Sequence, residues 1–171
     1  MKVLLHSCCG PCASACVPRL KEEGHEVKMF FANSNIDTEE EFERRLGAAR
    51  KVAEAEGVEL VPLKYDHEEW KREVAAGLEG EPEKGRRCEK CFRYNLKKTA
   101  EACGKLGMDA FTTSLTVSPH KVSEMVFGAS EDERFLKENF KKQEGFKRSL
   151  KRSEELGLYR QSYCGCEFSK R

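Results

Sequence analysis

Apolar residues occur in short runs along the chain, and glycine or proline separates most of the runs. The run KVLLHS at 2–7 is continuous and predicts a buried first strand. After Pro11, apolar positions three and four residues apart predict a helix that ends before Gly24. The segment 25–35, in which apolar positions alternate, predicts a second strand.

The alternation of strands and helices continues toward the C-terminus. A capping box, T-x-x-E, at Thr38 predicts the start of a helix that ends at Gly57. A third strand is predicted at 58–66, broken or at an edge because of Pro62, and a fourth at 108–117. Further helices are expected at 68–76, from Cys88 to Gly107, from Ser118-Pro119 onward, from a second capping box at Ser130 and Glu133 onward, and just before Gly157.

Strands that alternate with helices predict an α/β fold with a parallel sheet flanked by helices. We expect residues 1–171 to form a single α/β domain, with a helical, basic and Cys-bearing C-terminal part at 131–171 packed on it. In such sheets, sites form beyond the carboxyl ends of the strands. Cysteines occupy the loop after the first strand, where a phosphate-binding glycine loop often lies, which argues against nucleotide binding there.

The composition is that of a globular protein, since 39% of the 171 residues are apolar and 36% are charged. No apolar run approaches the length of a membrane span, and MKVLLHSCCG becomes polar too early for a secretory signal. We therefore expect a cytoplasmic protein with no membrane partner. Disulfides rarely persist in that compartment, so the nine cysteines need another explanation.

Seven of the nine cysteines form three tight groups with the patterns C-C-G-P-C, C-E-K-C and C-G-C. The groups contain Cys8, Cys9 and Cys12; Cys88 and Cys91; and Cys164 and Cys166. Packing alone rarely explains such spacing, which favours a metal site or thiol chemistry. Cys16 and Cys103 stand apart from the groups and are expected to be core residues.

Local structure predicts a geometry for each group. The two cysteines of C-E-K-C share a face at the start of a predicted helix, whose N-terminus is expected to lower their thiol pKa. The two cysteines of C-G-C would point to one side of an extended tail. Cys8 and Cys9 are adjacent, so their side chains would diverge in an extended chain.

Thiol-rich sets of this kind suit either zinc or an iron–sulfur cluster. A structural zinc needs four ligands, which C-E-K-C and C-G-C would supply, but the thiols of C-C-G-P-C would then have no role. A thiol redox relay is a third alternative, since C-G-P-C matches the C-x-x-C pattern of thioredoxin-like proteins. The spacing leaves all three open.

The net charge is only +1, but basic residues are concentrated in two blocks, each next to a cysteine group. The block 84–98 has seven Lys or Arg and one acid, and the block 134–152 has eight and two. Such blocks are usually solvated helix faces, and here they raise the alternative of a polyanion partner. Arg148, Lys151 and Arg152 are candidates for phosphate contacts. Tyr159 and Tyr163 are candidates for stacking on an unpaired base, and packing of the tail is the alternative role for both.

Five segments together resemble the signature of the cobalamin-independent epoxyqueuosine reductases, the QueH family, from Leu5 to Phe168. In chain order they are HSCCGPCA, FFANSNID, RCEKCFRYNL, DAFTTSLTVSPHK and EGFKRSLKRSEELGLYRQSYCGC. The resemblance implies a sheet related to the adenine-nucleotide-binding (HUP-like) folds of tRNA-modifying enzymes. It also implies the last step of queuosine synthesis, in which the epoxide of epoxyqueuosine at the wobble position of tRNA is reduced with loss of water.

The resemblance further implies a [4Fe-4S] cluster, an additional mononuclear iron and a reduced electron donor of the ferredoxin or flavodoxin type. It assigns metal binding to all seven grouped cysteines and a catalytic role to Cys8, Cys9 and Cys12, without dividing the seven between the two metal groups. The candidates for substrate binding are Thr112, Ser118, Lys121, Arg148 and Tyr163. The alternative function is a structural-zinc RNA-binding module without redox chemistry.

Four further residues carry weaker expectations. Asp37 and Asp66 follow predicted strands and are within reach of the site, but each is expected to be a solvated or capping residue. Asp109 precedes its strand and should lie at the far end of the sheet. His6 belongs to the first strand and is expected to be packed or hydrogen-bonded.

Overall fold

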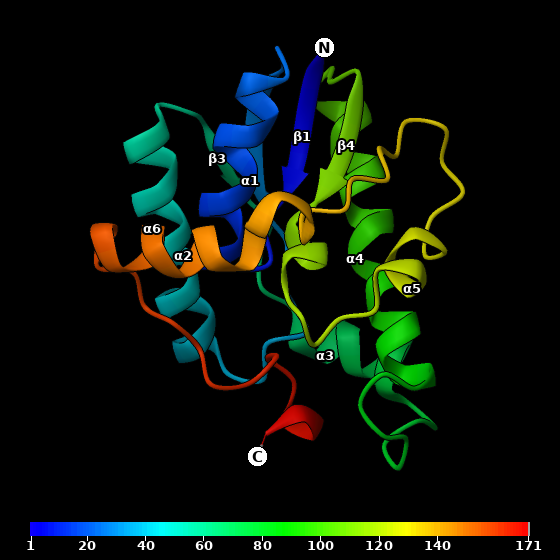
Figure 1. Cartoon of the computed structure of the whole chain (residues 1–171). Coiled ribbons are helices and arrows are strands. Elements are labelled where there is room, and N and C mark those ends of the chain that lie inside the picture. The colour runs from blue at the N-terminus through cyan, green and yellow to red at the C-terminus, as the bar shows by residue number, and fades with distance from the viewer. Residues whose placement is uncertain (171) are drawn as a thin grey trace.

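The computed structural model describes residues 1–170 and has a four-stranded sheet flanked by helices (Figure 1). The strands are all parallel and lie in the order β3-β2-β1-β4. Their bounds are β1 Lys2–His6, β2 Glu26–Phe31, β3 Leu60–Pro62 and β4 Ala110–Thr113. The prediction of an α/β fold with a parallel sheet is confirmed, and the strand that contains proline lies at an edge.

Helices connect the strands and cover the sheet. The longer helices are α1 Gly10–Glu22, α2 Glu39–Glu56, α4 Arg86–Lys105 and α6 Gly145–Leu156. The shorter ones are α3 His67–Trp70, which continues as the π-helix η1 Lys71–Ala75, and α5 Ser123–Phe127. Short 3-10 segments are η2 Ser114–Val117, η3 Lys142–Glu144 and η4 Glu167–Ser169. No helix within residues 1–170 combines the length and the apolar character that a membrane span needs.

The helices form a layer on each face of the sheet, with α1 and α2 on one face and α4 on the other (Figure 1). Side chains of β1 alternate between the two layers because successive residues of a strand point to opposite faces. Val3 and Leu5 pack with α1 and α2, whereas Leu4 packs with Phe92 and Leu96 of α4. The helix α6 packs against α1.

The turn from β1 into α1 is short and tightly packed. Cys9 caps the helix, since its backbone is extended and its Sγ accepts a hydrogen bond from the backbone N–H of Cys12. Pro11 lies in the first helical turn, as predicted. Gly10 approaches α2 so closely that a Cβ would lie 2.8 Å from the Cβ of Ala48. This contact fixes the start of α1 and, with it, the positions of Cys9 and Cys12.

His6 is a packed residue, as the sequence predicted. Its ring is fully buried, with Nδ1 2.9 Å from Thr113 Oγ1 and Nε2 3.0 Å from the carbonyl oxygen of Ala32. Burial lowers the pKa of His6 to about 4, so the imidazole is neutral at neutral pH. The ring therefore links β1 to β4 and to the chain after β2.

The predicted helix start at Ser118-Pro119 is wrong, and the predicted fourth strand is too long. The strand β4 ends at Thr113 because its side chain accepts a hydrogen bond from the backbone N–H of Leu115, which starts η2. The hydroxyl of Ser118 then accepts a hydrogen bond from the N–H of His120 in a turn. The helix α5 begins only at Ser123.

The predicted capping box at Ser130 and Glu133 starts no helix. The backbone of the following residues pairs with β4 instead. The N–H of Phe111 donates to the carbonyl of Arg134, and the N–H of Leu136 donates to the carbonyl of Phe111. Pairing with the sheet edge thus outweighs the local helix signal, and regular helix returns only at α6.

The contact between Gly10 and α2 can be tested by a pair of substitutions. We expect Gly10→Ala to lower the free energy of unfolding by about 1–3 kcal/mol, because the new methyl group overlaps Ala48. Gly47→Ala is the control, since nothing lies within 4 Å of a Cβ there; replacing this helical glycine should raise the free energy of unfolding by about 0.5–1 kcal/mol. Urea denaturation measures both, and equal effects would contradict the close contact.

Candidate metal centre

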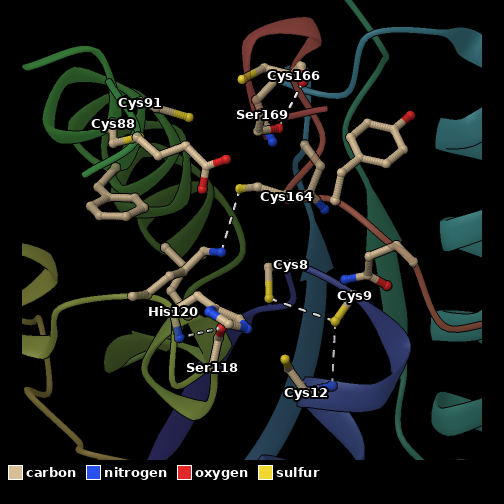
Figure 2. Close-up of a pocket in the computed structure, with 18 of the residues that line it drawn as sticks. Cys8, Cys9, Cys12, Cys88, Cys91, Ser118, His120, Cys164, Cys166 and Ser169 are labelled. Atoms are coloured by element: carbon tan, nitrogen blue, oxygen red, sulfur yellow. Dashed lines mark hydrogen bonds between the residues drawn. The ribbon is translucent and has the colours of Figure 1, made fainter. Parts of the chain in front are cut away.

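A cavity of about 270 Å³ lies beyond the carboxyl ends of the strands, where the sequence predicted the site. It is lined by cysteines from the β1–α1 turn, from the start of α4 and from the tail after α6, which we define as residues 157–170 (Figure 2). These are all seven grouped cysteines: Cys8, Cys9, Cys12, Cys88, Cys91, Cys164 and Cys166. Cys16 and Cys103 are fully buried away from the cavity, as predicted.

The thiols of Cys8, Cys9 and Cys12 form a compact triad, with their three sulfurs within 4.8 Å of one another. The sulfurs of Cys8 and Cys9 are 3.9 Å apart, so the prediction that these adjacent side chains diverge is wrong. They converge because the chain turns here, where Cys9 caps α1 instead of extending β1. Ser114, just after β4, donates a hydrogen bond to the Cys8 sulfur at 3.2 Å.

Hydrogen bonds within the triad separate the pKa values of its thiols. Bonds from Cys12 and Cys8 hold the pKa of Cys9 well below its usual value. Bonds with Cys8 and Cys9 raise the pKa of Cys12 well above its usual value. The triad therefore stabilises a thiolate on Cys9, and the thiolate is the form of cysteine that binds metals.

Cys88 and Cys91 lie one turn apart near the start of α4 and both line the cavity, as predicted (Figure 2). Burial raises the pKa of both thiols. The prediction that the helix N-terminus lowers these pKa values is therefore wrong, because desolvation outweighs the helix dipole. The backbone N–H of Lys84 donates to the Cys88 sulfur, and the indole N–H of Trp70 donates to the Cys91 sulfur, both at 3.4 Å.

The tail that carries Cys164 and Cys166 is held by a buried arginine of α2. The guanidinium of Arg45 donates to the carbonyl of Cys164 at 2.7 Å and to the carbonyl of Tyr163 at 3.0 Å. Arg45 is 1% exposed and pairs with Glu41, which is also buried, at 2.9 Å. One guanidinium thus connects the core of the protein to two successive peptide groups of the tail.

Gly165, between the two tail cysteines, occupies a position that only glycine fits. Its φ is 150°, and a Cβ would lie 3.0 Å from Asn35 Nδ2 and 3.3 Å from Arg45 Nη1. Its carbonyl accepts a hydrogen bond of 2.9 Å from the backbone N–H of Asp37. The glycine of C-G-C is therefore required for the tail to lie against the chain after β2.

Lys121 places a cation between the triad and the other thiols. Its Nζ lies 3.4 Å from the Cys164 sulfur. Burial alone would lower the pKa of Lys121, but negative charge on Cys164, Cys8 and Cys12 outweighs burial and raises it. The ammonium group therefore compensates negative charge on both sets of sulfurs.

The spacing of the sulfurs limits the metal groups that they match. A tetrahedral zinc, with bonds of about 2.3 Å, holds its sulfurs about 3.8 Å apart. Within residues 1–170, the triad is the one group of three or more possible ligands that lie close enough together to hold a metal ion, and Cys88, Cys91, Cys164 and Cys166 form no such group. The triad therefore matches a single metal ion, whereas the other four thiols do not match a single zinc.

Of the five predicted substrate-binding residues, Ser118, Lys121 and Tyr163 line the cavity. Thr112 does not, because it is fully buried in β4 and its hydroxyl donates to a backbone carbonyl of the segment beside that strand. Arg148 is exposed on α6, outside the cavity lining. The structure thus brings three of the five together with the cysteines.

Neither aspartate that follows a predicted strand lines the cavity. Asp37 forms an ion pair with Lys170 at 2.7 Å and accepts a hydrogen bond of 2.7 Å from the hydroxyl of Tyr163. Asp66 caps α3 by accepting a hydrogen bond from the backbone N–H of Glu69. Asp66 has the capping role that was expected, and Asp37 helps to hold the tail.

Three residues that hold or line the site have no role in the predictions from the sequence: Arg45, Trp70 and Phe146. Arg45 had a signal, since it forms with Glu41 a charged pair four residues apart on the buried side of a predicted helix. Trp70 and Phe146 had no such signal in the sequence. The thiol that Trp70 contacts and the cysteines of the cavity that Phe146 lines are distant from them along the chain.

Comparison with known proteins gives consistent matches over nearly the whole chain. The model of a family described as Epoxyqueuosine reductase QueH matches residues 3–171. A protein of that name from Streptococcus pyogenes serotype M1 is 37% identical over 179 residues, which cover 98% of this chain and 69% of the relative. Proteins of the same name from Haemophilus influenzae and Thermotoga maritima are each 33% identical, with 99% and 98% of this chain covered and 72% and 89% of the relatives.

Substitution of Arg45 tests how the tail is held. We expect Arg45→Lys to lower the free energy of unfolding by about 1–3 kcal/mol, because an ammonium group cannot bind Glu41 and two carbonyl oxygens in the same geometry. Arg44→Lys is the matched control, with an expected effect below about 0.5 kcal/mol because its side chain is 52% exposed. A similar loss in both variants, measured by chemical denaturation, would argue against the role of Arg45.

Proposed function

The chain belongs to the QueH family of epoxyqueuosine reductases, and we propose that it reduces the epoxide of epoxyqueuosine in tRNA to the alkene of queuosine. The observation that carries this proposal is the convergence of seven thiols, from three distant segments, in one cavity beyond the carboxyl ends of the sheet. So many thiols in one place suit redox-active metal groups.

The reaction has a simple balance. Both carbon–oxygen bonds at the epoxide oxygen break, a carbon–carbon double bond forms, and the oxygen leaves as water. Two electrons and two protons are consumed. We assign the supply of electrons to a reduced donor of the ferredoxin or flavodoxin type, which the protein would meet as a separate partner.

The thiols fit the two metal groups that the family resemblance implies, a [4Fe-4S] cluster and a single iron. We assign the cluster to Cys88, Cys91, Cys164 and Cys166, because a cluster takes four thiolates and these four thiols form no group that could hold a single ion. We assign the single iron to the triad, whose sulfurs lie close together. When bound, these groups would supply single electrons and a Lewis acid for the negative charge that develops on the epoxide oxygen.

Polar side chains of the cavity are placed to orient a substrate. Asn95 is 3% exposed, and its Nδ2 donates to the Oδ1 of Asn35 at 3.3 Å. Within residues 1–170, the Oδ1 of Asn95 has no hydrogen-bond partner. An unpaired buried acceptor costs about 1–3 kcal/mol, which a hydroxyl or amine of the substrate would offset. Lys121 adds N–H donors on the same cavity, next to Cys164.

The mouth of the cavity has the features of a surface that binds unpaired RNA. Two exposed apolar side chains, Val122 at 44% and Phe146 at 39%, line it. Lys84 and Arg160 are exposed on the same lining. An aromatic ring with cations around it suits a stacked base and its phosphates.

Phe146 takes the place of Tyr163 as the stacking candidate. The hydroxyl of Tyr163 is bonded to Asp37, and its ring lies 5.0 Å from the guanidinium of Arg45 and 5.3 Å from the ammonium of Lys170. Phe146 contacts no other ring or cation in the described part of the chain. Its exposed ring is therefore available to a base.

An anaerobic assay tests the proposed function. The purified protein should be brown and, with dithionite as reductant, should convert epoxyqueuosine in tRNA to queuosine, detected by mass spectrometry of the nucleosides. Colourless protein with stoichiometric zinc and no conversion would favour a structural-zinc RNA-binding module. Full conversion after complete removal of metals would favour a thiol relay at C-G-P-C.

Single cysteine substitutions test the division of the thiols. Cys91→Ala should abolish the visible absorbance and the paramagnetic signal of the cluster, whereas Cys9→Ala should keep both and lose about one iron per chain. Cys103→Ala is the control, because this buried residue lies outside the cavity lining and should cost stability with full iron content. Loss of the cluster signal in Cys9→Ala would show that the division is wrong.

The role of Phe146 can be measured by RNA binding. We expect Phe146→Ala to weaken the binding of an anticodon stem–loop by about 5–150-fold, which corresponds to the ~1–3 kcal/mol of one stacked base. Phe146→Tyr keeps the aromatic face and should bind as the parent does. Fluorescence anisotropy at one fixed salt concentration gives both affinities. Equal affinities of the alanine variant and the parent would remove this ring from the interface.

A further inference from the structure

Trp70 directs its only polar group at a thiol of the candidate metal centre. Its side chain is 1% exposed, and the indole Nε1–H donates to the Cys91 sulfur at 3.4 Å. Within residues 1–170 the indole N–H makes no other hydrogen bond. A buried indole N–H normally has a polar partner, and a neutral thiol is a weak one. The bond is strong only when the sulfur carries negative charge.

The indole ring is held in place independently of Cys91. His67 stacks on Trp70 with ring centroids 5.1 Å apart and an angle of 13° between the planes. The carbonyl of Ser34 lies 2.7 Å from Nδ1 of His67, and a carboxylate oxygen of Glu167 lies 3.0 Å from Nε2. Packing therefore sets the direction of the indole N–H before any metal binds.

Cys91 has few other groups that stabilise negative charge. The amide nitrogen of Asn95 is farther from its sulfur, at 3.9 Å, and the ammonium group of Lys121 contacts Cys164 instead. Within residues 1–170, the N–H of Trp70 therefore makes the shorter of the two hydrogen bonds to the Cys91 sulfur.

We propose that Trp70 is a positioning residue that raises the reduction potential of the metal group held by Cys91. The inference rests on the proposed function, because it takes Cys91 as a ligand of the iron–sulfur cluster. Reduction adds one negative charge to a cluster, so an N–H···S bond stabilises the reduced form more than the oxidised form. Trp70 thus acts through the Cys91 sulfur and makes the cluster easier to reduce.

Trp70 is the single tryptophan of the chain, so a tryptophan analogue that replaces it everywhere changes this residue alone. An analogue with a similar ring removes the N–H and keeps the shape of the side chain. Biosynthetic replacement of tryptophan by β-(3-benzothienyl)alanine puts a sulfur atom where the N–H was. In a redox titration of the holoprotein followed by paramagnetic resonance, we expect a more negative midpoint potential with unchanged iron content. Trp70→Phe should shift the potential in the same direction.

Tyr94→Phe is the matched control. Tyr94 packs in the same apolar cluster as Trp70, but its hydroxyl donates to Glu69 at 2.7 Å and to no sulfur. Its removal should leave the midpoint potential unchanged. The proposal is overturned if the benzothienyl protein keeps the parent potential, or if Tyr94→Phe shifts the potential equally.

The titration needs no RNA, so it separates this inference from the proposed function. A more negative potential in a protein that does not reduce epoxyqueuosine supports the role of Trp70 and contradicts the proposed function. An unchanged potential in an active enzyme contradicts the role of Trp70 alone. A chain that binds no cluster under anaerobic reconstitution contradicts both.

Discussion

The cost of negative charge on sulfur away from bulk water is the constraint on which the rest of this structure depends. A buried thiolate is unfavourable unless cations or hydrogen-bond donors replace the solvent. Separate donors in the cavity serve individual sulfurs. Ser114 donates to Cys8, Lys121 donates to Cys164, and the indole N–H of Trp70 donates to Cys91. These donors only partly replace water, as the raised pKa values at the start of α4 show. A metal bound at these thiols would complete the compensation and would then stabilise the folded state.

The three cysteine groups are held by different means. Those of the β1–α1 turn and of α4 sit on regular elements that the sheet and its two apolar cores orient. The tail has little regular structure, so its cysteines are placed by side-chain bonds from Arg45 and by the close fit of Gly165. The guanidinium is itself paired with Glu41 inside the protein. One part of the candidate site therefore depends on a buried ion pair rather than on a strand or helix.

The sequence predicted the features that depend on local or periodic patterns of residues. Periodic apolar positions indicated a parallel α/β sheet, and the three cysteine patterns marked the segments that meet in the cavity. Predictions failed where tertiary contacts outweigh local signals. The capping box at Ser130 starts no helix, because the residues after it pair with the edge of β4. The expected divergence of the Cys8 and Cys9 side chains requires an extended chain there, but a helix begins at this point and the two sulfurs lie close together. Trp70 had no local signal, because its partner thiol lies on another helix.

The segment that replaces a predicted helix beside β4 has a wider consequence. Strands at the margins of a sheet expose unpaired peptide groups, which invite association with other chains. Here one margin is covered at Phe111 by residues 134–136, and the other is a strand of three residues that ends in Pro62. Neither margin offers a long row of free peptide groups for a neighbouring molecule. A partner of this protein would therefore be recognised through side chains, such as those around the opening to the thiols, rather than through the backbone of the sheet.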